Sequence, residues 1–304
     1  MLPFGFASVT WTELRRDKFM KTIHRLVATL CAGVVLTGCV ARERAAAAEA
    51  ARPVVIQGAM EVEVRKLAAI IEGVSEEHVK GWTFWRGTVD GYPVVVSKTL
   101  KGMENAAAAT AIAAERYHPI AIVNQGTAGG HTPDLHVYDI VLGADAVNLG
   151  SFKSGYRRRG QGMSAADWLP LDLMRTDGSA AQDPNARRMR RFHADESLLG
   201  VARSISGTYQ RGRVVDGVIG SSEVWNSEID RIEDFHQRFG TTVEEMETAS
   251  AAQIAGLFEI PFAGIRVVSN NITNEGAYDA GTAEACQDYV YLVVKRYISD
   301  KLKR

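Results

Sequence analysis

The sequence predicts a single α/β domain with a central mixed sheet flanked by helices. From Pro53 onward, short apolar segments typical of strands alternate with segments of helical periodicity, which is the pattern of a sheet covered by helices on both faces. The chain has 304 residues, 46% of them hydrophobic, which is enough to bury a full core. We find no internal repeat. We therefore expect one folded domain, residues 54–304, behind an N-terminal extension.

The first half of this domain is predicted to contain three strands and two helices. Residues 53–58 are a short apolar strand, followed by a helix over 60–73. A second strand with a glycine turn covers 92–102, and the alanine-rich residues 103–117 follow as a helix because alanine has the highest helix propensity. Residues 120–130 are predicted to be a strand that enters a glycine-rich loop.

The second half follows the same alternation. Residues 136–149 and 212–225 have the composition of strands. Residues 242–260 are predicted to be a helix and 261–271 a final core strand. Residues 282–302 close the chain as an amphipathic helix.

One segment departs from the alternation. Residues 151–206 are polar, rich in arginine and only weakly periodic, so we interpret them as an insertion over the site or at an oligomer contact. Its arginine clusters, residues 156–160 and 186–192, are interpreted as a solvated polar face. The formal net charge of −1 gives no indication of a nucleic-acid partner.

The cysteines argue against both a zinc site and a disulfide framework. Only Cys31, Cys39 and Cys286 occur, without a CxxC pair or a Cys/His ligand spacing, so we predict no metal site. Cys286 is interpreted as a small buried hydrophobe.

The N-terminal extension resembles a bacterial lipoprotein signal. After Met20, a basic start leads into an apolar stretch of signal-peptide length, too short to span a membrane, which ends in Leu36-Thr37-Gly38-Cys39. This ending resembles a lipobox, in which a peptidase cuts before the cysteine and the cysteine carries lipid. An ordinary secretory signal and a buried helix are the alternatives.

This interpretation divides the extension into three parts. Residues 1–19 become a lead-in that is not native to the protein, 20–38 the signal peptide, and 39–53 an alanine-rich tether. The protein would be exported and anchored to the membrane through Cys39. Val40 stands where an aspartate is linked with retention in the inner membrane, which favours the periplasmic side of the outer membrane or the cell surface.

Polar residues follow the predicted strands at the ends where α/β folds bind ligands. Carboxylates, a glycine-rich segment and an amide gather there, a set that suits a polar, uncharged or cationic ligand such as a sugar. The sequence GTAGG does not match the motifs that hold dinucleotides or nucleoside triphosphates. The residues at the strand ends are Glu61, Glu63, Thr127 to Gly130, Ser221 to Asn226, Glu245, Glu247, Ser269 and Asn270.

Four segments resemble, in order, the signatures of a known family. GAMEVEV, VNQGTAGG, EMETASAA and VVSNN are similar to segments of the 5′-methylthioadenosine/S-adenosylhomocysteine nucleosidases, in the purine nucleoside phosphorylase superfamily. The resemblance runs from about Val54 to Tyr297, except for residues 151–206. It implies a phosphorylase-type domain that hydrolyses the N-glycosidic bond of a purine nucleoside without a cofactor, and a homodimer.

The resemblance also implies roles for single residues. Glu63 matches the base that activates the attacking water, and Glu247 the carboxylate that binds the ribose 2′- and 3′-hydroxyls. Asn270 stands at the position that contacts the purine. The predicted catalytic residues are therefore Glu63 and Asn270, and the predicted substrate-binding residues are Met60, Thr127, Ala128, Gly129, Val224, Trp225, Met246, Glu247 and Ser269.

Physical chemistry agrees with hydrolysis. Glycosidic cleavage passes through a cationic sugar that nearby carboxylates stabilise, and one carboxylate has the two acceptor oxygens that vicinal hydroxyls require. The negative charge of AMEVE, residues 59–63, would repel a phosphate nucleophile. A nucleoside phosphorylase and a non-catalytic nucleoside-binding lipoprotein are the alternative functions.

Asn270 departs from the family pattern. The family's strand typically ends in Ser-Asp, and that aspartate delivers a proton to purine N7. An amide has no acidic form near neutral pH, but it both donates and accepts hydrogen bonds. We predict either a preference for 6-oxopurine nucleosides, or a weakened adenine nucleosidase or nucleoside binder. Asn271, Glu275 or Asp279 remain candidates for a substitute acid.

Several of these side chains also have purely structural interpretations. Glu61 suits the first turn of a helix, and Glu245 a helix cap. Met60, Met246 and Trp225 are common core residues. The histidines, His131, His136, His193 and His236, are interpreted as surface or loop residues.

Overall fold

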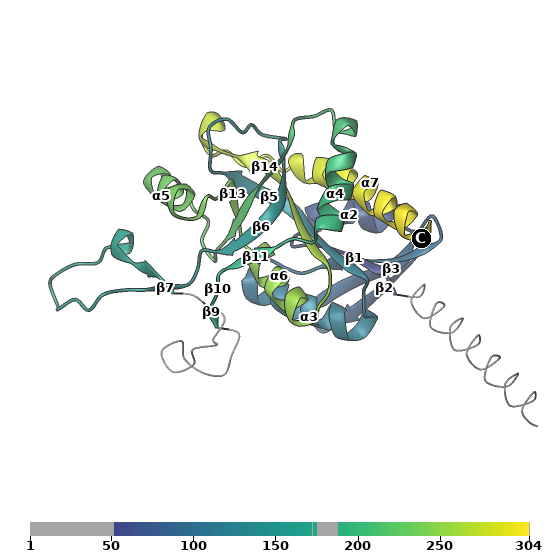
Figure 1. Ribbon diagram of the computed structural model, residues 1–304, viewed down its shortest axis with the longest axis horizontal. Helices are drawn as coiled ribbons and strands as arrows, with labels where there is room; N and C mark the ends of the chain where they lie inside the picture. The colour runs from purple at the N-terminus through teal and green to yellow at the C-terminus, as the bar shows by residue number, and fades with distance from the viewer. Residues whose placement is uncertain (1–51, 172, 175–187, 304) are drawn as a thin grey trace, which may run out of the picture. The chain divides into compact units, whose positions relative to one another are not determined.

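The computed structural model describes residues 52–171, 173–174 and 188–303 (Figure 1). The lead-in, the signal peptide, and the tether from Cys39 to Ala51 lie outside these residues, as do residues 172 and 175–187 of the arginine-rich segment. Within the described part of the chain, no helix has both the length and the apolarity to cross a membrane.

A ten-stranded mixed sheet forms the centre of the domain. Its order is β11-β6-β12-β13-β5-β1-β4-β3-β2, with β14 paired to both β5 and β6. The strands are β1 (Val54–Gly58), β2 (Glu72–Val79), β3 (Trp82–Val89), β4 (Tyr92–Lys98), β5 (Ala121–Gly130), β6 (Ile140–Asn148), β11 (Arg191–His193), β12 (Val214–Ser221), β13 (Val243–Glu245) and β14 (Phe262–Asn270). The mixed sheet that the sequence predicts is confirmed.

Helices cover both faces of this sheet (Figure 1). One core contains Val54 and Ile56 of β1 together with side chains of α2 (Glu61–Ile70), α4 (Glu196–Ser204) and α7 (Thr282–Leu302). The other contains Val55, between those two strand residues, together with side chains of α3 (Met103–Tyr117) and α6 (Thr248–Leu257). Successive strand residues point to opposite faces of the sheet, so β1 contributes side chains to both cores.

Two helices have the predicted bounds, and two predictions need correction. α3 and α7 cover residues 103–117 and 282–302. The predicted helix over 242–260 is instead strand β13 followed by α6, because β13 pairs with both β12 and β5. The predicted glycine-rich loop is wrong as well, since β5 continues as a strand to Gly130.

The hairpin β2–β3 was not predicted. Most residues of β2 are exposed and polar, so the strand lacks the alternation that indicates a half-buried strand. It lies at the edge of the sheet and pairs only with β3.

The arginine-rich segment has two parts. The short pairs β7 (Phe152–Lys153) with β8 (Leu169–Pro170), and β9 (Leu173–Met174) with β10 (Arg188–Met189), stand apart from the main sheet, and residues 156–160 are exposed. From Arg191 onward the segment is built into the domain. β11 pairs with β6, and α4 packs against α7, where the Tyr289 hydroxyl donates to the Ala202 carbonyl at 2.7 Å.

The other described elements lie outside the main sheet and its covering helices. They are α5 (Ile229–Phe239) and the 3-10 turns Ala165–Asp167, Ser206–Thr208 and Ile272–Asn274. Cys286 is fully buried in the first core, which confirms its interpretation as a small hydrophobe.

Candidate active site

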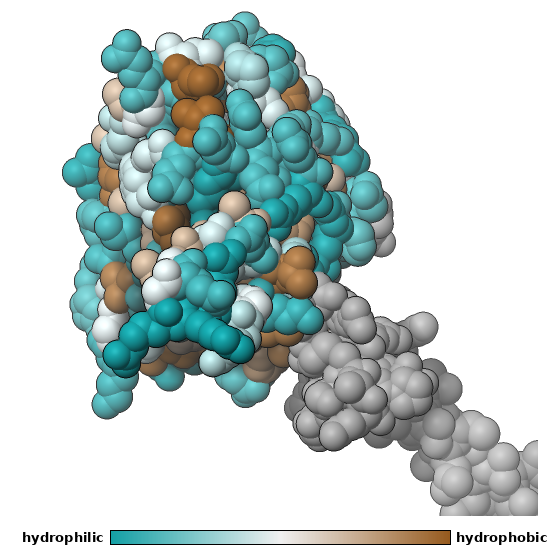
Figure 2. All heavy atoms as spheres, turned by 90° about the vertical axis from the view of Figure 1, so that its left-hand side faces the viewer, coloured by the Kyte–Doolittle hydropathy of each residue, from teal (hydrophilic) through white to brown (hydrophobic). Residues whose placement is uncertain are grey.

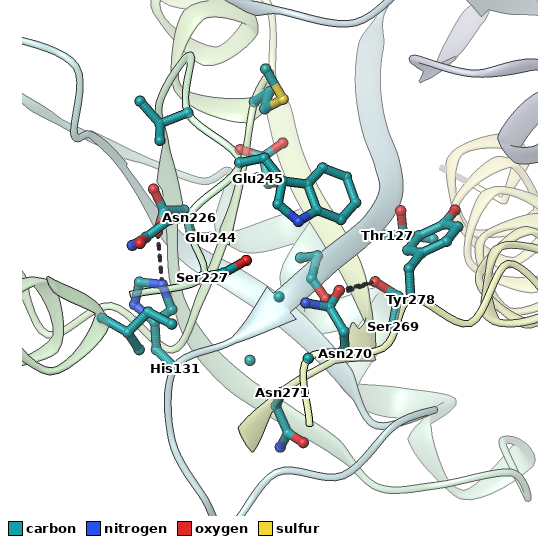
Figure 3. Close-up of a pocket in the computed structure, with 18 of the residues that line it drawn as sticks. Thr127, His131, Asn226, Ser227, Glu244, Glu245, Ser269, Asn270, Asn271 and Tyr278 are labelled. Carbon is teal, nitrogen blue, oxygen red and sulfur yellow. Dashed lines mark hydrogen bonds and ion pairs between the residues drawn. The ribbon is translucent and has the colours of Figure 1, made fainter. Parts of the chain in front are cut away.

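A pocket of about 340 Å³ lies where β5, β13 and β14 end. Every described residue that the sequence assigns to catalysis or substrate binding lines it (Figure 3). These residues come from α2, β5, the segments after β12 and β13, and the end of β14. The volume lies in the range of small-molecule sites.

Glu63 is fixed in place by four donors. Its Oε2 accepts the amides of Ala59 and Met60 at 2.9 and 3.0 Å, and its Oε1 accepts the amide and hydroxyl of Thr127 at 2.9 and 3.1 Å. It is 3% exposed at the first turn of α2, where free amides point outward. A Cβ on Gly126 would lie 2.7 Å from Oε1, so this close approach requires glycine. The carboxylate is therefore rigid and faces the pocket.

Glu245 forms a buried ion pair with Arg266, which the sequence analysis missed. The Glu245 carboxylate accepts Nε of Arg266 at 3.1 Å, its Nη2, and the hydroxyl of Ser221. It also accepts the amides of Glu247 and Thr248, so Glu245 caps α6 while being buried. The arginine inside the apolar strand sequence FAGIRVV could have indicated a buried ion pair, because charged residues are fully buried only when they are paired.

Glu247 stands beside this pair, and no cation of the described residues forms an ion pair with its carboxylate. Its Oε1 accepts the amide of Gly102 at 2.9 Å. Burial, and next the negative charge of Glu245, raise the pKa of Glu247 to about 8, against the opposing effect of Arg266. A pKa above neutrality favours the protonated form of Glu247 at pH 7.

Asn270 presents its amide nitrogen to the pocket. Its Oδ1 accepts the hydroxyl of Ser269 at 2.8 Å (Figure 3), and the described residues contain no hydrogen-bond partner for Nδ2. Nδ2 lies 3.4 Å from the position that a Cβ on Gly129 would take, so it stands over Gly129.

The proposed substitute acids differ in position. Glu275 is exposed and lines the pocket, whereas Asp279 does not line it and accepts the amide of Gly281 at 2.8 Å. Asn271 uses its amide locally, donating to the carbonyl of Leu135 and accepting the amide of Thr273.

A second buried cluster, missed in the sequence, lies at another wall of the pocket. His131 lies in the loop after β5, but it is 7% exposed and is therefore not a surface residue. Its Nε2 is 3.0 Å from Oε2 of Glu244, and its Nδ1 is 2.7 Å from the hydroxyl of Thr241. Glu244 also accepts the hydroxyl of Ser222 at 2.7 Å and the amide of Asn226 at 2.9 Å. Only the pairing of β13 with β5 brings His131 and Glu244 together.

Apolar side chains surround the mouth of the pocket. Trp225 is 61% exposed, so it is not a core residue, and its ring lies edge-on to Tyr278 at 5.9 Å. Val224, Ile229 and Ile272 are also exposed. Hydrophobic side chains interrupt the hydrophilic surface on this side of the domain, where α5 lies (Figure 2). Met60 and Met246 are half-buried and line the pocket.

The charged lining is mostly acidic. Among the described residues, Lys101 and His131 are the cationic or potentially cationic side chains of the lining, and no arginine reaches it. Within the same described ranges, no group of three His, Cys, Asp or Glu side chains is placed to hold a metal.

Comparison with known proteins identifies the family. The family model described as "Phosphorylase superfamily" matches residues 53–299. A 5′-methylthioadenosine/S-adenosylhomocysteine nucleosidase of Bacillus cereus (strain G9842) is 30% identical over 222 residues, which cover 71% of this chain and 85% of the relative. The chain belongs to this nucleosidase family.

Solved structures share the fold of this nucleosidase-family chain. A Neisseria meningitidis 5′-methylthioadenosine/S-adenosylhomocysteine nucleosidase in complex with methylthio-immucillin-A has a TM-score of 0.64 at 24% identity, covering 80% of this chain and 99% of the other. The futalosine hydrolase of Helicobacter pylori strain 26695 also has a TM-score of 0.64, at 20% identity, covering 80% and 97%.

Proposed function

We propose that this chain is a purine nucleosidase in which Glu63 activates water and Glu247 binds the ribose. The observation that carries the proposal is that both carboxylates line one pocket together with Asn270. A nucleoside placed with its base toward Asn270 and its sugar toward Glu247 brings the glycosidic bond near Glu63.

The reaction follows from these positions. The oxygen of a water attacks C1′, Glu63 takes the proton of that water, and the C1′–N9 bond breaks with its electrons going to the base. The departing base takes a proton from solvent, and Glu63 returns its proton to solvent before the next turnover. The sugar carries positive charge in the transition state, which the nearby carboxylates stabilise. The hydroxyls at C2′ and C3′ donate to Glu247, whose two oxygens match a vicinal diol.

The lining supports water over phosphate as the nucleophile. A phosphate at C1′ would lie among Glu63, Glu245 and Glu247, and Arg266, which lies beside them, is already paired to Glu245. Arginine binds phosphate through two parallel hydrogen bonds, and no arginine lines the pocket in the described residues. Hydrolysis is therefore the preferred reaction.

Asn270 supports a preference for 6-oxopurine nucleosides. Its Nδ2 can donate to N7 or O6, but it has no proton to transfer to an adenine leaving group. We expect inosine to have a higher kcat/KM than adenosine or methylthioadenosine, and Asn270→Asp to raise the ratio of adenosine to inosine kcat/KM by about tenfold or more.

An assay of free-base release from inosine, adenosine and methylthioadenosine, run with and without phosphate, measures these kcat/KM values. A phosphate requirement with release of ribose 1-phosphate would indicate a phosphorylase instead. Tight binding without release of base, unchanged by Glu63→Gln, would indicate a nucleoside-binding protein. A wild type that strongly favours adenine nucleosides contradicts the 6-oxopurine preference.

The lipid anchor is proposed from residues 20–39, which lie outside the described part of the chain. Their resemblance to a lipobox supports lipid attachment at Cys39, and a position on the periplasmic side of the outer membrane or the cell surface. We expect Cys39→Ser to abolish incorporation of labelled palmitate and to move the protein from the membrane to the soluble fraction. Cys31→Ser is the control. Labelled palmitate retained in Cys39→Ser would exclude this anchor.

A homodimer is proposed from the family resemblance. The exposed apolar side chains around the pocket mouth, which include Trp225 and Ile272, support it, because contiguous apolar patches mark interaction sites. Light scattering of the purified chain measures its mass directly.

A further inference from the structure

We propose that residues 152–171, which we call the arm, bind the surface of an anionic lipid bilayer. The arm belongs to the arginine-rich segment that departs from the α/β alternation, and it supplies no residue to the pocket. The inference therefore goes beyond the proposed nucleosidase function and concerns a part of the chain that the reaction does not use.

The arm projects from the domain and is almost wholly exposed. Its two ends pair as β7 and β8, apart from the main sheet, and the chain between them extends away from the body of the domain (Figure 1). Every residue from Lys153 to Leu171 is exposed except Ser164. A single pair of strands has no core of its own, so the arm cannot bury its own apolar side chains.

Large apolar side chains are nevertheless concentrated on the arm. Five of the sixteen large hydrophobic side chains that are exposed in the described residues lie between positions 156 and 171. Met163 and Tyr156 are 98% and 92% exposed, more than any other member of that set, and the others are Trp168, Leu169 and Leu171. Apolar surface gathered in this way marks an interaction site.

The arm is also basic. It carries four cations, Lys153 and Arg157 to Arg159, and one carboxylate, Asp167, which gives a net charge of +3 in a chain whose net charge is −1. Arg157 pairs with Asp167 inside the arm, whereas no carboxylate of the described residues forms an ion pair with the other three cations. These cations are therefore available to an anionic partner.

The base of the arm is held against α5. Arg238 of α5 donates to the carbonyls of Ala166 and Trp168 at 3.0 and 3.1 Å, and the ring of Phe152 stacks on that of Phe235 with the centroids 6.1 Å apart. The arm is therefore attached to the domain by side-chain contacts as well as by the chain itself, so a surface that binds the arm also holds the domain.

The combination of side chains favours a bilayer as the partner. Lysine and arginine are attracted to anionic headgroups, whereas tyrosine, tryptophan and leucine insert at the boundary between headgroups and acyl chains. A nucleic acid is not favoured, because the domain as a whole is not basic. The lipid anchor proposed at Cys39 would bring the domain to a bilayer, where a basic and apolar patch provides the second contact that stable attachment needs.

Cosedimentation with vesicles tests the inference. The probes are vesicles of phosphatidylcholine alone and of phosphatidylcholine mixed equally with anionic phosphatidylglycerol. The full chain is used with Cys39→Ser, so that no lipid on Cys39 contributes. We expect this parent chain to bind the anionic vesicles at least about tenfold more tightly than the neutral ones at low salt, and to lose most of this preference at high salt because salt screens the attraction.

Two further chains separate the arm from the rest of the surface. The charge variant replaces the three cations of the arm that lack an ion pair, and the matched control replaces three exposed cations elsewhere in the domain. The replacements are Lys153→Gln, Arg158→Gln and Arg159→Gln in the charge variant, and Arg65→Gln, Lys80→Gln and Lys303→Gln in the control. The charge variant should lose the preference for anionic vesicles, and the control should keep it.

The apolar part of the arm is tested by Tyr156→Ser with Met163→Ser. Both side chains are exposed, so the fold should not change, and binding to anionic vesicles should weaken about fivefold or more. Base release by each variant at the parent rate would show that the fold and the pocket are intact.

Three results would overturn the inference: equal binding of the parent chain to both kinds of vesicle, a charge variant that keeps the preference for anionic vesicles, or an apolar variant that binds as the parent does. A charge variant that keeps this preference but has a lower mass in light scattering would make the arm a contact between copies of the chain instead. Vesicle binding without base release would contradict the proposed function and leave the inference standing.

Discussion

Glu63→Gln should reduce kcat by about 10³-fold and leave nucleoside affinity nearly unchanged, because general-base catalysis contributes on this scale. The glutamine has the shape of the glutamate but cannot accept a proton from water. Nucleoside binding relies on Glu247, on Asn270 and on the apolar side chains at the mouth of the pocket, and the substitution leaves all of these in place. Steady-state base release and calorimetry with substrate separate the two quantities.

The same substitution should also lower the free energy of unfolding by about 1–3 kcal/mol. Four donors converge on the Glu63 oxygens, and the amide nitrogen of glutamine would face two of them. At least one backbone N–H would then lose its acceptor.

Glu61→Gln is the control for both effects. Glu61 lies on the same turn of α2, but it is exposed and pairs with Lys98 at 2.9 Å outside the pocket. An exposed pair of this kind contributes little to stability. A similar loss of kcat in both variants, or a loss below tenfold in Glu63→Gln, would rule out the role of Glu63 as the base.

Glu247→Gln should change both the pH dependence of stability and the activity. The pKa of Glu247 in the folded chain, about 8, lies above the ordinary value of 4.5, so the folded state binds the proton more tightly than the unfolded state does. The stability that this proton provides is complete below pH 4.5 and is lost as pH rises to 8. The loss is at most about 5 kcal/mol, and it should disappear in Glu247→Gln.

The activity should follow the opposite trend with pH. Ribose hydroxyls donate to the ionised carboxylate, so kcat/KM should rise with pH up to about 8 as Glu247 loses its proton. Glu247→Gln should remove this rise and lower kcat/KM by about 10²-fold, since an amide has one acceptor oxygen for two hydroxyls.

Urea unfolding and base release from pH 5 to 9 measure the two trends, with Glu61→Gln as the control that should follow wild type. Nucleoside binding near pH 7 should also release protons, which calorimetry in buffers of different ionisation enthalpy detects. Parallel pH profiles of wild type and Glu247→Gln would contradict both expectations.

The sequence was sufficient where local pattern and chemistry agree. Alanine and the spacing of apolar residues determine α3 and α7, so their bounds could be predicted from residues 103–117 and 282–302 alone. Strand ends in α/β folds meet at one edge, so the polar residues that follow the predicted strands fall together in one pocket.

It was insufficient where pairing over long distances overrides the local pattern. Residues 242–260 have the pattern of one helix, so β13 could not be predicted from them. It is a strand because β12 and β5 supply hydrogen-bond partners on both sides. The polar strand β2 likewise depends on β3 for its partners.

The sequence by itself determined the mixed α/β fold, the acidic character of the site, and the unusual amide at Asn270. Only the tertiary structure decided how the charges are shared. It pairs Glu245 with Arg266 and Glu244 with His131, and Glu247 is buried with no ion pair to a cation of the described residues. The reason is that the consecutive glutamates of β13 point to opposite faces of the sheet. Arg266 of β14 meets Glu245 on one face, and His131, which directly follows β5, meets Glu244 on the other.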